Sequence, residues 1–201
     1  MNDEITVIGL GNILWADEGF GVRVAEKLST IYSCRNDITI IDGGTQGLAL
    51  LPWLKGRKKV MILDAIDFNM APGDLAVFWN NDVPVYLSAK KLSLHQTGFS
   101  EVLSLSELMG DMPEEIVLIG VQPECIEDYG GSLSETVRKK LNDAVGIAMD
   151  ILHHWGISSS ENSAGERINH ESLELEKYEQ GRPDEYMAFR GGDIRVLMQD
   201  N

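Results

Sequence analysis

Apolar runs that predict strands alternate with segments of helical spacing over the first 156 residues. The strand-like runs fall at 4–9, 38–42, 59–67, 75–79 and 115–121. Apolar residues recur at the spacing of an amphipathic helix over 18–33, 46–54, 93–109 and 132–156. Such alternation is typical of proteins in which crossover helices cover both faces of a parallel sheet. We therefore predict a three-layer α/β/α sandwich with a twisted, mostly parallel, five-stranded sheet, in which 75–79 forms a hairpin-like pair.

Local signals predict where several helices begin and end. Ser93 with Gln96, and Ser132 with Glu135, match the capping box, in which the serine caps a helix start. Gly156 marks the expected end of the last helix. Pro52 restricts the helix predicted over 46–54.

The pattern changes after Gly156. Residues 158–166, SSSENSAGE, form a polar stretch, and the remainder is acidic with little periodicity. We therefore predict an α/β domain over 1–156 and a polar, acidic C-terminal tail over 157–201, which is flexible or loosely docked.

The charge of the chain excludes several classes of partner. The net charge is −15, with 17 basic and 32 acidic residues, so binding to nucleic acid or to anionic membranes is disfavoured. No apolar run approaches the roughly 20 residues needed to span a bilayer, and no signal peptide is visible, which predicts a cytoplasmic protein. Cys34 and Cys125 form no C-x-x-C pair, so we expect two reduced, buried thiols rather than a zinc or redox site.

The turn after the first strand, GLGNILWADEGFG at 9–21, carries more glycine and acid than a plain connection needs. A dinucleotide-binding turn reads G-x-G-x-x-G, but here Leu14 takes the third glycine position. Asp42 could act as a ribose-binding acid, yet Asp17 and Glu18 would repel a pyrophosphate at the helix start. A nucleotide site is therefore disfavoured.

A metal site is the alternative. Glu18 follows the first strand, Asp64 ends the third, and His95 lies in the first turn of the helix that follows Ser93. Strand C-termini and helix N-termini share one edge of a parallel sheet, where ligand sites form. Two carboxylates and an imidazole suit a divalent metal such as Zn²⁺ or Ni²⁺. Each residue also has an ordinary explanation, as an acid at a helix start, a turn cap or a solvated histidine.

Several longer motifs carry a family resemblance. They are GLGNILWADEGFGVRVAE, IDGGTQGL, ILDAID followed by APG, YLSAKKLSLHQ, FSEVL and DYGGSLSE. Over roughly residues 4–155 the chain resembles the [NiFe]-hydrogenase maturation endopeptidases, and most of all the branch that serves membrane-bound uptake hydrogenases. The resemblance implies a phosphorylase/hydrolase-like α/β sandwich.

The resemblance also implies a function. Family members remove a C-terminal extension from the precursor of the hydrogenase large subunit after nickel insertion, with the substrate's nickel as the recognition signal. The family's metal-contacting residues correspond to Glu18, Asp64 and His95, and we add Asp42 as a catalytic candidate on the same edge. Zinc or cadmium could occupy the site in the isolated protein. A chaperone that recognises nickel without cleaving remains an alternative.

Other residues of these motifs have a structural interpretation, and some have a functional one as well. Gly43 and Gly44 would either form a tight turn or allow close approach of a peptide backbone. Asp17 is expected to be the N-cap of the first helix. Trp15 would be either an exposed substrate contact or a partly buried anchor for its loop.

Overall fold

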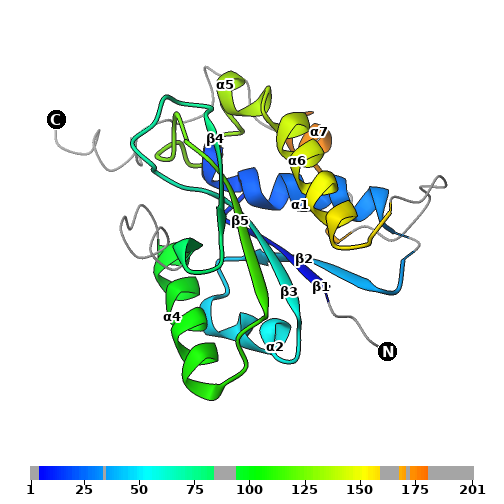
Figure 1. Cartoon of the computed structure of the whole chain (residues 1–201). Coiled ribbons are helices and arrows are strands. Elements are labelled where there is room, and N and C mark those ends of the chain that lie inside the picture. The colour runs from blue at the N-terminus through cyan, green and yellow to red at the C-terminus, as the bar shows by residue number, and fades with distance from the viewer. Residues whose placement is uncertain (1–4, 34, 84–93, 159–167, 171–172, 181–201) are drawn as a thin grey trace, which may run out of the picture.

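A five-stranded sheet forms the centre of the protein, as the computed structural model in Figure 1 shows. The structure describes residues 5–33, 35–83, 94–158, 168–170 and 173–180. The strands are β1 (Ile5–Leu10), β2 (Ile38–Gly44), β3 (Lys59–Ala65), β4 (Leu75–Trp79) and β5 (Glu115–Val121). Their order is β2-β1-β3-β5-β4, and β4 alone of these strands runs antiparallel, beside β5. The predicted five-stranded, mostly parallel sheet is confirmed. The hairpin-like pairing of 75–79 with the strand before it is wrong, because β5 lies between β3 and β4 and is the antiparallel partner of β4.

Helices cover both faces of this sheet, which confirms the three-layer sandwich (Figure 1). On one face lie α1 (Phe20–Ile31), α5 (Glu135–Arg138), α6 (Leu141–His154) and α7 (Leu175–Gln180). The other face carries α2 (Leu51–Leu54) and α4 (Leu94–Met109), together with the 3-10 turn η2 (Gly47–Leu50). A second 3-10 turn, η1 (Ala16–Gly19), joins β1 to α1. Each layer of helices closes its own apolar core.

The last predicted helix starts later than expected and is interrupted. Ser134, not Ser132, is the N-cap of α5, because its Oγ accepts a hydrogen bond from the Val137 N–H at 3.3 Å. The Ser132 hydroxyl instead donates to Glu179. The predicted end at Gly156 is confirmed by its φ of +92° and by the Ile157 N–H, which donates to Leu152 O at 2.8 Å. The Ser93 cap lies outside the described residues.

The glycines of the turn serve close packing of the backbone. A Cβ on Gly21 would lie 2.1 Å from Leu63 O, so the first turn of α1 rests directly on the sheet. Gly11, at φ +117°, would place a Cβ 1.8 Å from Glu18 O. Contacts within the protein therefore account for both glycines without a bound phosphate.

The structure also bears on the predictions for the cysteines and for membrane-spanning segments. Cys125 is free and exposed, so the prediction of a buried thiol is wrong for this residue, while Cys34 lies outside the described residues. The surface loop that carries Cys125 is held by the Cys125 N–H, which donates to Asp17 Oδ2 at 2.8 Å, and not by burial of the thiol. Within the described ranges no helix is both long and apolar enough to span a bilayer.

Candidate functional site

The C-terminal ends of β1, β2 and β3 form the edge that carries the predicted site residues. Gly9 of β1 is in register with Asp42 on one side and with Leu63, the residue before Asp64, on the other. Asp42 and Asp64 therefore flank β1 at one end of the sheet, two strand spacings or about 10 Å apart.

The two aspartates point to opposite faces of the sheet. Asp64 alternates with Leu63 and so shares the face of Ile62, in the core under α2 and α4. Asp42 shares the face of Ile40, which packs against the core under α1. Asp42 instead lines a groove of about 590 Å³, whose wall includes Gln46, Trp53 and Asn169. The catalytic role of Asp42 stays a prediction, and it would act from the rim of the sheet.

Asp64 is the least expected side chain in β3. It is fully buried, and its Oδ1 accepts a hydrogen bond from the Ala65 N–H at 2.8 Å. Burying a carboxylate costs several kcal/mol unless hydrogen bonds or opposite charge compensate. The other buried residues of β3 are Val, Met, Ile, Leu and Ala, so the strand keeps one buried acid near its C-terminal end.

Glu18 is brought to the same edge by η1. This turn contacts β3, and the Glu18 N–H donates to Trp15 O at 2.9 Å. The Glu18 side chain is half-buried. The absence of a side chain on Gly11 allows this approach, since any Cβ there would collide with the Glu18 carbonyl.

His95 is the second residue of α4, and its side chain lies outside the described part of the structure. The start of α4 is located by two glycines. A Cβ on Gly98 would lie 2.9 Å from Gly47 Cα, so the first turns of α4 contact η2, just beyond the end of β2. Among the side chains that are described, no three of His, Cys, Asp and Glu form a metal-binding group. The trio with His95 therefore stays a prediction.

Asp17 has a role that the sequence did not reveal. Its buried carboxylate accepts four hydrogen bonds: from the N–H groups of Glu124, Cys125 and Ser134 at 2.9, 2.8 and 2.7 Å, and from the Ser134 hydroxyl at 3.0 Å. The prediction of a helix N-cap is wrong, because neither η1 nor α1 has a side-chain cap. Asp17 clamps the turn that carries Glu18 onto the segment 124–134.

Trp15 is a partly buried anchor for its loop, one of the two interpretations that its sequence position allowed. Its side chain is 37% exposed, and its ring meets the ring of Tyr129 edge to face, with centroids 5.2 Å apart. Backbone bridging also joins the two residues. The anchoring of the loop is thus confirmed, and a substrate contact by the exposed part of Trp15 stays a prediction.

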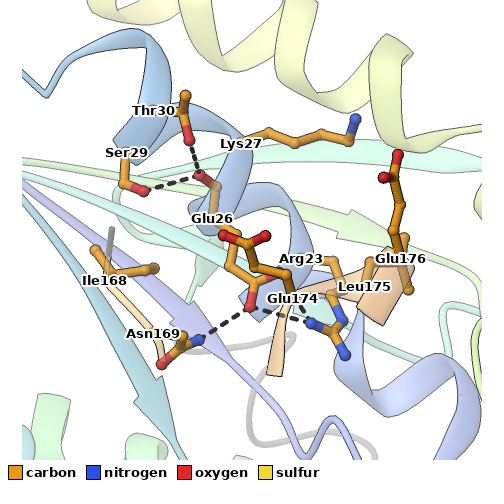
Figure 2. A pocket seen from close by; sticks show the side chains of 10 residues that line it. All are labelled: Arg23, Glu26, Lys27, Ser29, Thr30, Ile168, Asn169, Glu174, Leu175 and Glu176. Carbon is orange, nitrogen blue, oxygen red and sulfur yellow. Dashed lines mark hydrogen bonds and ion pairs between the residues drawn. The ribbon is translucent and has the colours of Figure 1, made fainter. Parts of the chain in front are cut away.

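Part of the predicted tail lies against α1, where it encloses Arg23 (Figure 2). The side chain of Arg23 is 2% exposed and bonds to both carboxylate oxygens of Glu26 at 3.0 Å. It also donates to Leu173 O, and its guanidinium lies 5.5 Å from the centre of the Tyr178 ring. Asn169 Nδ2 donates to Glu26 at 3.0 Å. Residues far along the chain thus complete the surroundings of a buried cation.

A second set of contacts joins α7 to α5. Glu179 accepts hydrogen bonds from Arg138 and from Ser132. The hydrogen bond to Glu179 raises the pKa of the Arg138 guanidinium above its usual value. The segment beside the Asp17 clamp is thereby tied to the C-terminal part of the chain.

Comparison with known proteins identifies relatives over nearly the whole sequence. A family model described as hydrogenase maturation protease matches residues 22–151. The hydrogenase expression/formation protein HoxM of Azotobacter vinelandii is 44% identical, over 97% of this chain and 95% of its own length. HoxM of Cupriavidus necator is also 44% identical, over 98% of this chain and 99% of its own.

The solved structure of the E. coli endopeptidase HybD confirms the fold. It superposes with a TM-score of 0.74 at 35% identity, covering 79% of this chain and 96% of its own. About a fifth of this chain thus has no counterpart there, whereas the HoxM proteins align with nearly all of it. The additional length is therefore a feature shared with the HoxM relatives.

Proposed function

Because this chain belongs to the hydrogenase maturation protease family, we propose that it removes the C-terminal extension of a [NiFe]-hydrogenase large-subunit precursor after nickel insertion. That it is a protease follows from the family; the substrate and the nickel signal are the proposal. The observation that carries it is the meeting of η1 and β3, which brings the chain segments of Glu18 and Asp64 together at one sheet edge.

The metal belongs to the substrate in this proposal. Nickel held by the precursor would be met by the carboxylates of Glu18 and Asp64 and by the imidazole of His95. Oxygen and nitrogen donors of this kind suit divalent nickel, and also zinc or cadmium in the isolated protein. A precursor without nickel would bring no positive centre to these carboxylates, and desolvating them without one is unfavourable.

The protein's own side chains would position the scissile bond and take a proton from the attacking water. A bound metal polarises a carbonyl or lowers the pKa of water. A carboxylate on the rim, for which Asp42 is our candidate, would accept a proton from the attacking water. We propose no acyl-enzyme, since no serine or cysteine with a paired base stands out in the sequence or among the described residues.

The charge and composition of the chain support a proposal for its binding partner and its cellular compartment. With a net charge of −15, the protein would act on a protein partner rather than on nucleic acid. We place it in the cytoplasm, without direct insertion into a membrane.

The test is incubation of the protein with nickel-loaded and with nickel-free precursor, followed by intact mass measurement. We expect the mass of the C-terminal extension to be lost from the nickel-loaded precursor only, and Glu18→Gln to prevent this loss while the variant stays folded. Cleavage of both precursors would remove nickel as the signal. A stable complex with an uncut precursor would favour the chaperone alternative.

A further inference from the structure

An exposed apolar cluster lies beside the candidate site. Leu14, Trp15 and Tyr129, which we call the rim patch, are 38%, 37% and 61% exposed. We propose that the rim patch docks an apolar segment of the precursor polypeptide and so sets the precursor's affinity; this inference rests on the proposed function.

The rim patch is held rigidly by backbone bonds. The Gly130 N–H donates to Leu14 O at 2.7 Å, and the Trp15 N–H donates to Asn12 O at 3.0 Å. The Leu14 N–H donates to the Asn12 side chain, also at 3.0 Å. A preformed aromatic surface loses little conformational freedom on binding, which favours affinity.

The patch is continuous with the candidate site. Trp15 O accepts the Glu18 N–H, so the exposed ring and the predicted ligand belong to one turn. The segment that carries Tyr129 is held to the same turn by Asp17, which accepts hydrogen bonds from the N–H groups of Glu124 and Cys125. A polypeptide that reaches Glu18 would therefore pass over or beside these rings.

Charge around the patch defines the chemistry of its occupant. Glu124 and Glu127 are exposed in the segment before Tyr129, and Glu18 lies on the opposite side of Trp15 along the chain. An apolar centre with an acidic margin suits a polypeptide that presents an apolar side chain flanked by Lys or Arg. Tryptophan and tyrosine are the residue types that most often dominate binding energy at protein interfaces.

Trp79 provides a matched control. It is 38% exposed, almost the same as Trp15, but it lies at the end of β4 on the far edge of the sheet from β2. The two tryptophans are thus similarly exposed, but Trp79 lies on the edge strand β4 and not in the turn that carries Glu18.

The test measures cleavage of nickel-loaded precursor as a function of its concentration. For W15A/Y129A we expect KM to rise at least about tenfold, with kcat within about twofold of the wild type, and W15F/Y129F to recover most of the affinity. W79A should leave both constants unchanged. Glu124→Gln with Glu127→Gln should raise KM less, and more at low salt than at high salt.

Failure of this inference is distinct from failure of the proposed function. If folded W15A/Y129A had the wild-type KM, docking of the precursor at the rim patch would be refuted. It would also be refuted if W79A raised KM as much as W15A/Y129A does. If the wild type cleaves nothing, the proposed function fails, and calorimetric binding of the precursor to wild type and to W15A/Y129A still decides the docking role. Equal affinity of the two proteins would then refute it.

Discussion

Asp17 and Ser134 are joined by two hydrogen bonds although 117 positions separate them in the chain. The Ser134 N–H donates to one carboxylate oxygen at 2.7 Å and its hydroxyl to the other at 3.0 Å. Ser134 at the same time caps α5. One serine thus fixes the start of a helix and the turn that carries Glu18.

Loss of the Asp17 carboxylate should destabilise the protein strongly. Asp17→Ala leaves three backbone N–H groups without their acceptor, and each such loss costs about 1–3 kcal/mol. We expect a loss of at least about 3 kcal/mol in the free energy of unfolding, measured by urea denaturation.

Ser134→Ala serves as the graded control. It keeps the backbone bond to Asp17 and removes the hydroxyl and the helix cap, so a loss of about 1 kcal/mol is expected. Equal losses for the two variants would contradict the central position of the carboxylate.

The contact between α1 and the sheet should not tolerate a methyl group. In Gly21→Ala the new Cβ would lie 2.1 Å from Leu63 O, and a backbone atom cannot move aside as a flexible side chain can. We expect the variant to be insoluble or to unfold at a much lower temperature. Gly146→Ala in α6 is the control, since nothing lies within 4 Å of its Cβ, and it should stabilise the helix by up to about 1 kcal/mol.

The contact of α7 with α5 should contribute measurably to stability. Glu179→Ala removes the nearer acidic partner of Arg138, whose side chain is 32% exposed and which also pairs with Glu135 at 3.8 Å. Solvent screening limits the expected loss to about 1 kcal/mol. Glu176→Ala, an exposed position on the same helix, should change the unfolding free energy by less than half as much. A larger effect at 176 than at 179 would refute the importance of this ion pair.

The side chains of Asp42 and Asp64 point to opposite faces of the sheet, so we expect their substitution to affect different properties, metal affinity for Asp64 and kcat for Asp42. Asp64→Asn should weaken binding of zinc or cadmium to the isolated protein, because it removes a predicted ligand. Asp42→Asn should leave that affinity unchanged and lower kcat for precursor cleavage by about 10²-fold, the lower range for a proton acceptor. Isothermal titration and cleavage kinetics measure the two effects, and weakened metal binding in Asp42→Asn would place it among the ligands.

Much of the fold could be predicted because it depends on local patterns. Continuous apolar runs such as 59–67 predicted buried strands. The positions of Glu18 at a helix start and of Asp64 at a strand end predicted their edge of the sheet. Topology also grouped these acids with His95, and the resemblance added what spacing could not, namely the large-subunit precursor as the substrate and its nickel as the recognition signal.

The missed features all depend on partners distant in the chain. The sequence around Asp17 is typical of a helix cap. It contains no signal that predicts hydrogen bonds to residues more than 100 positions away. Ser132 matched the capping box through Glu135, whereas Ser134 has Val137 three residues on and did not. Ser134 is nevertheless the cap, and the Ser132 hydroxyl donates to the distant Glu179. The directions of Asp42 and Asp64 required the register of the strands.

Arg23 has a consequence for truncation of the chain. Its guanidinium in α1 contacts the carbonyl of Leu173 and the ring of Tyr178. Removing the chain from residue 168 onward would expose Arg23 and Glu26 together to water. Residues beyond the α/β domain thus complete its packing, and we expect a shortened chain to need substitutions in α1 to regain the lost stability.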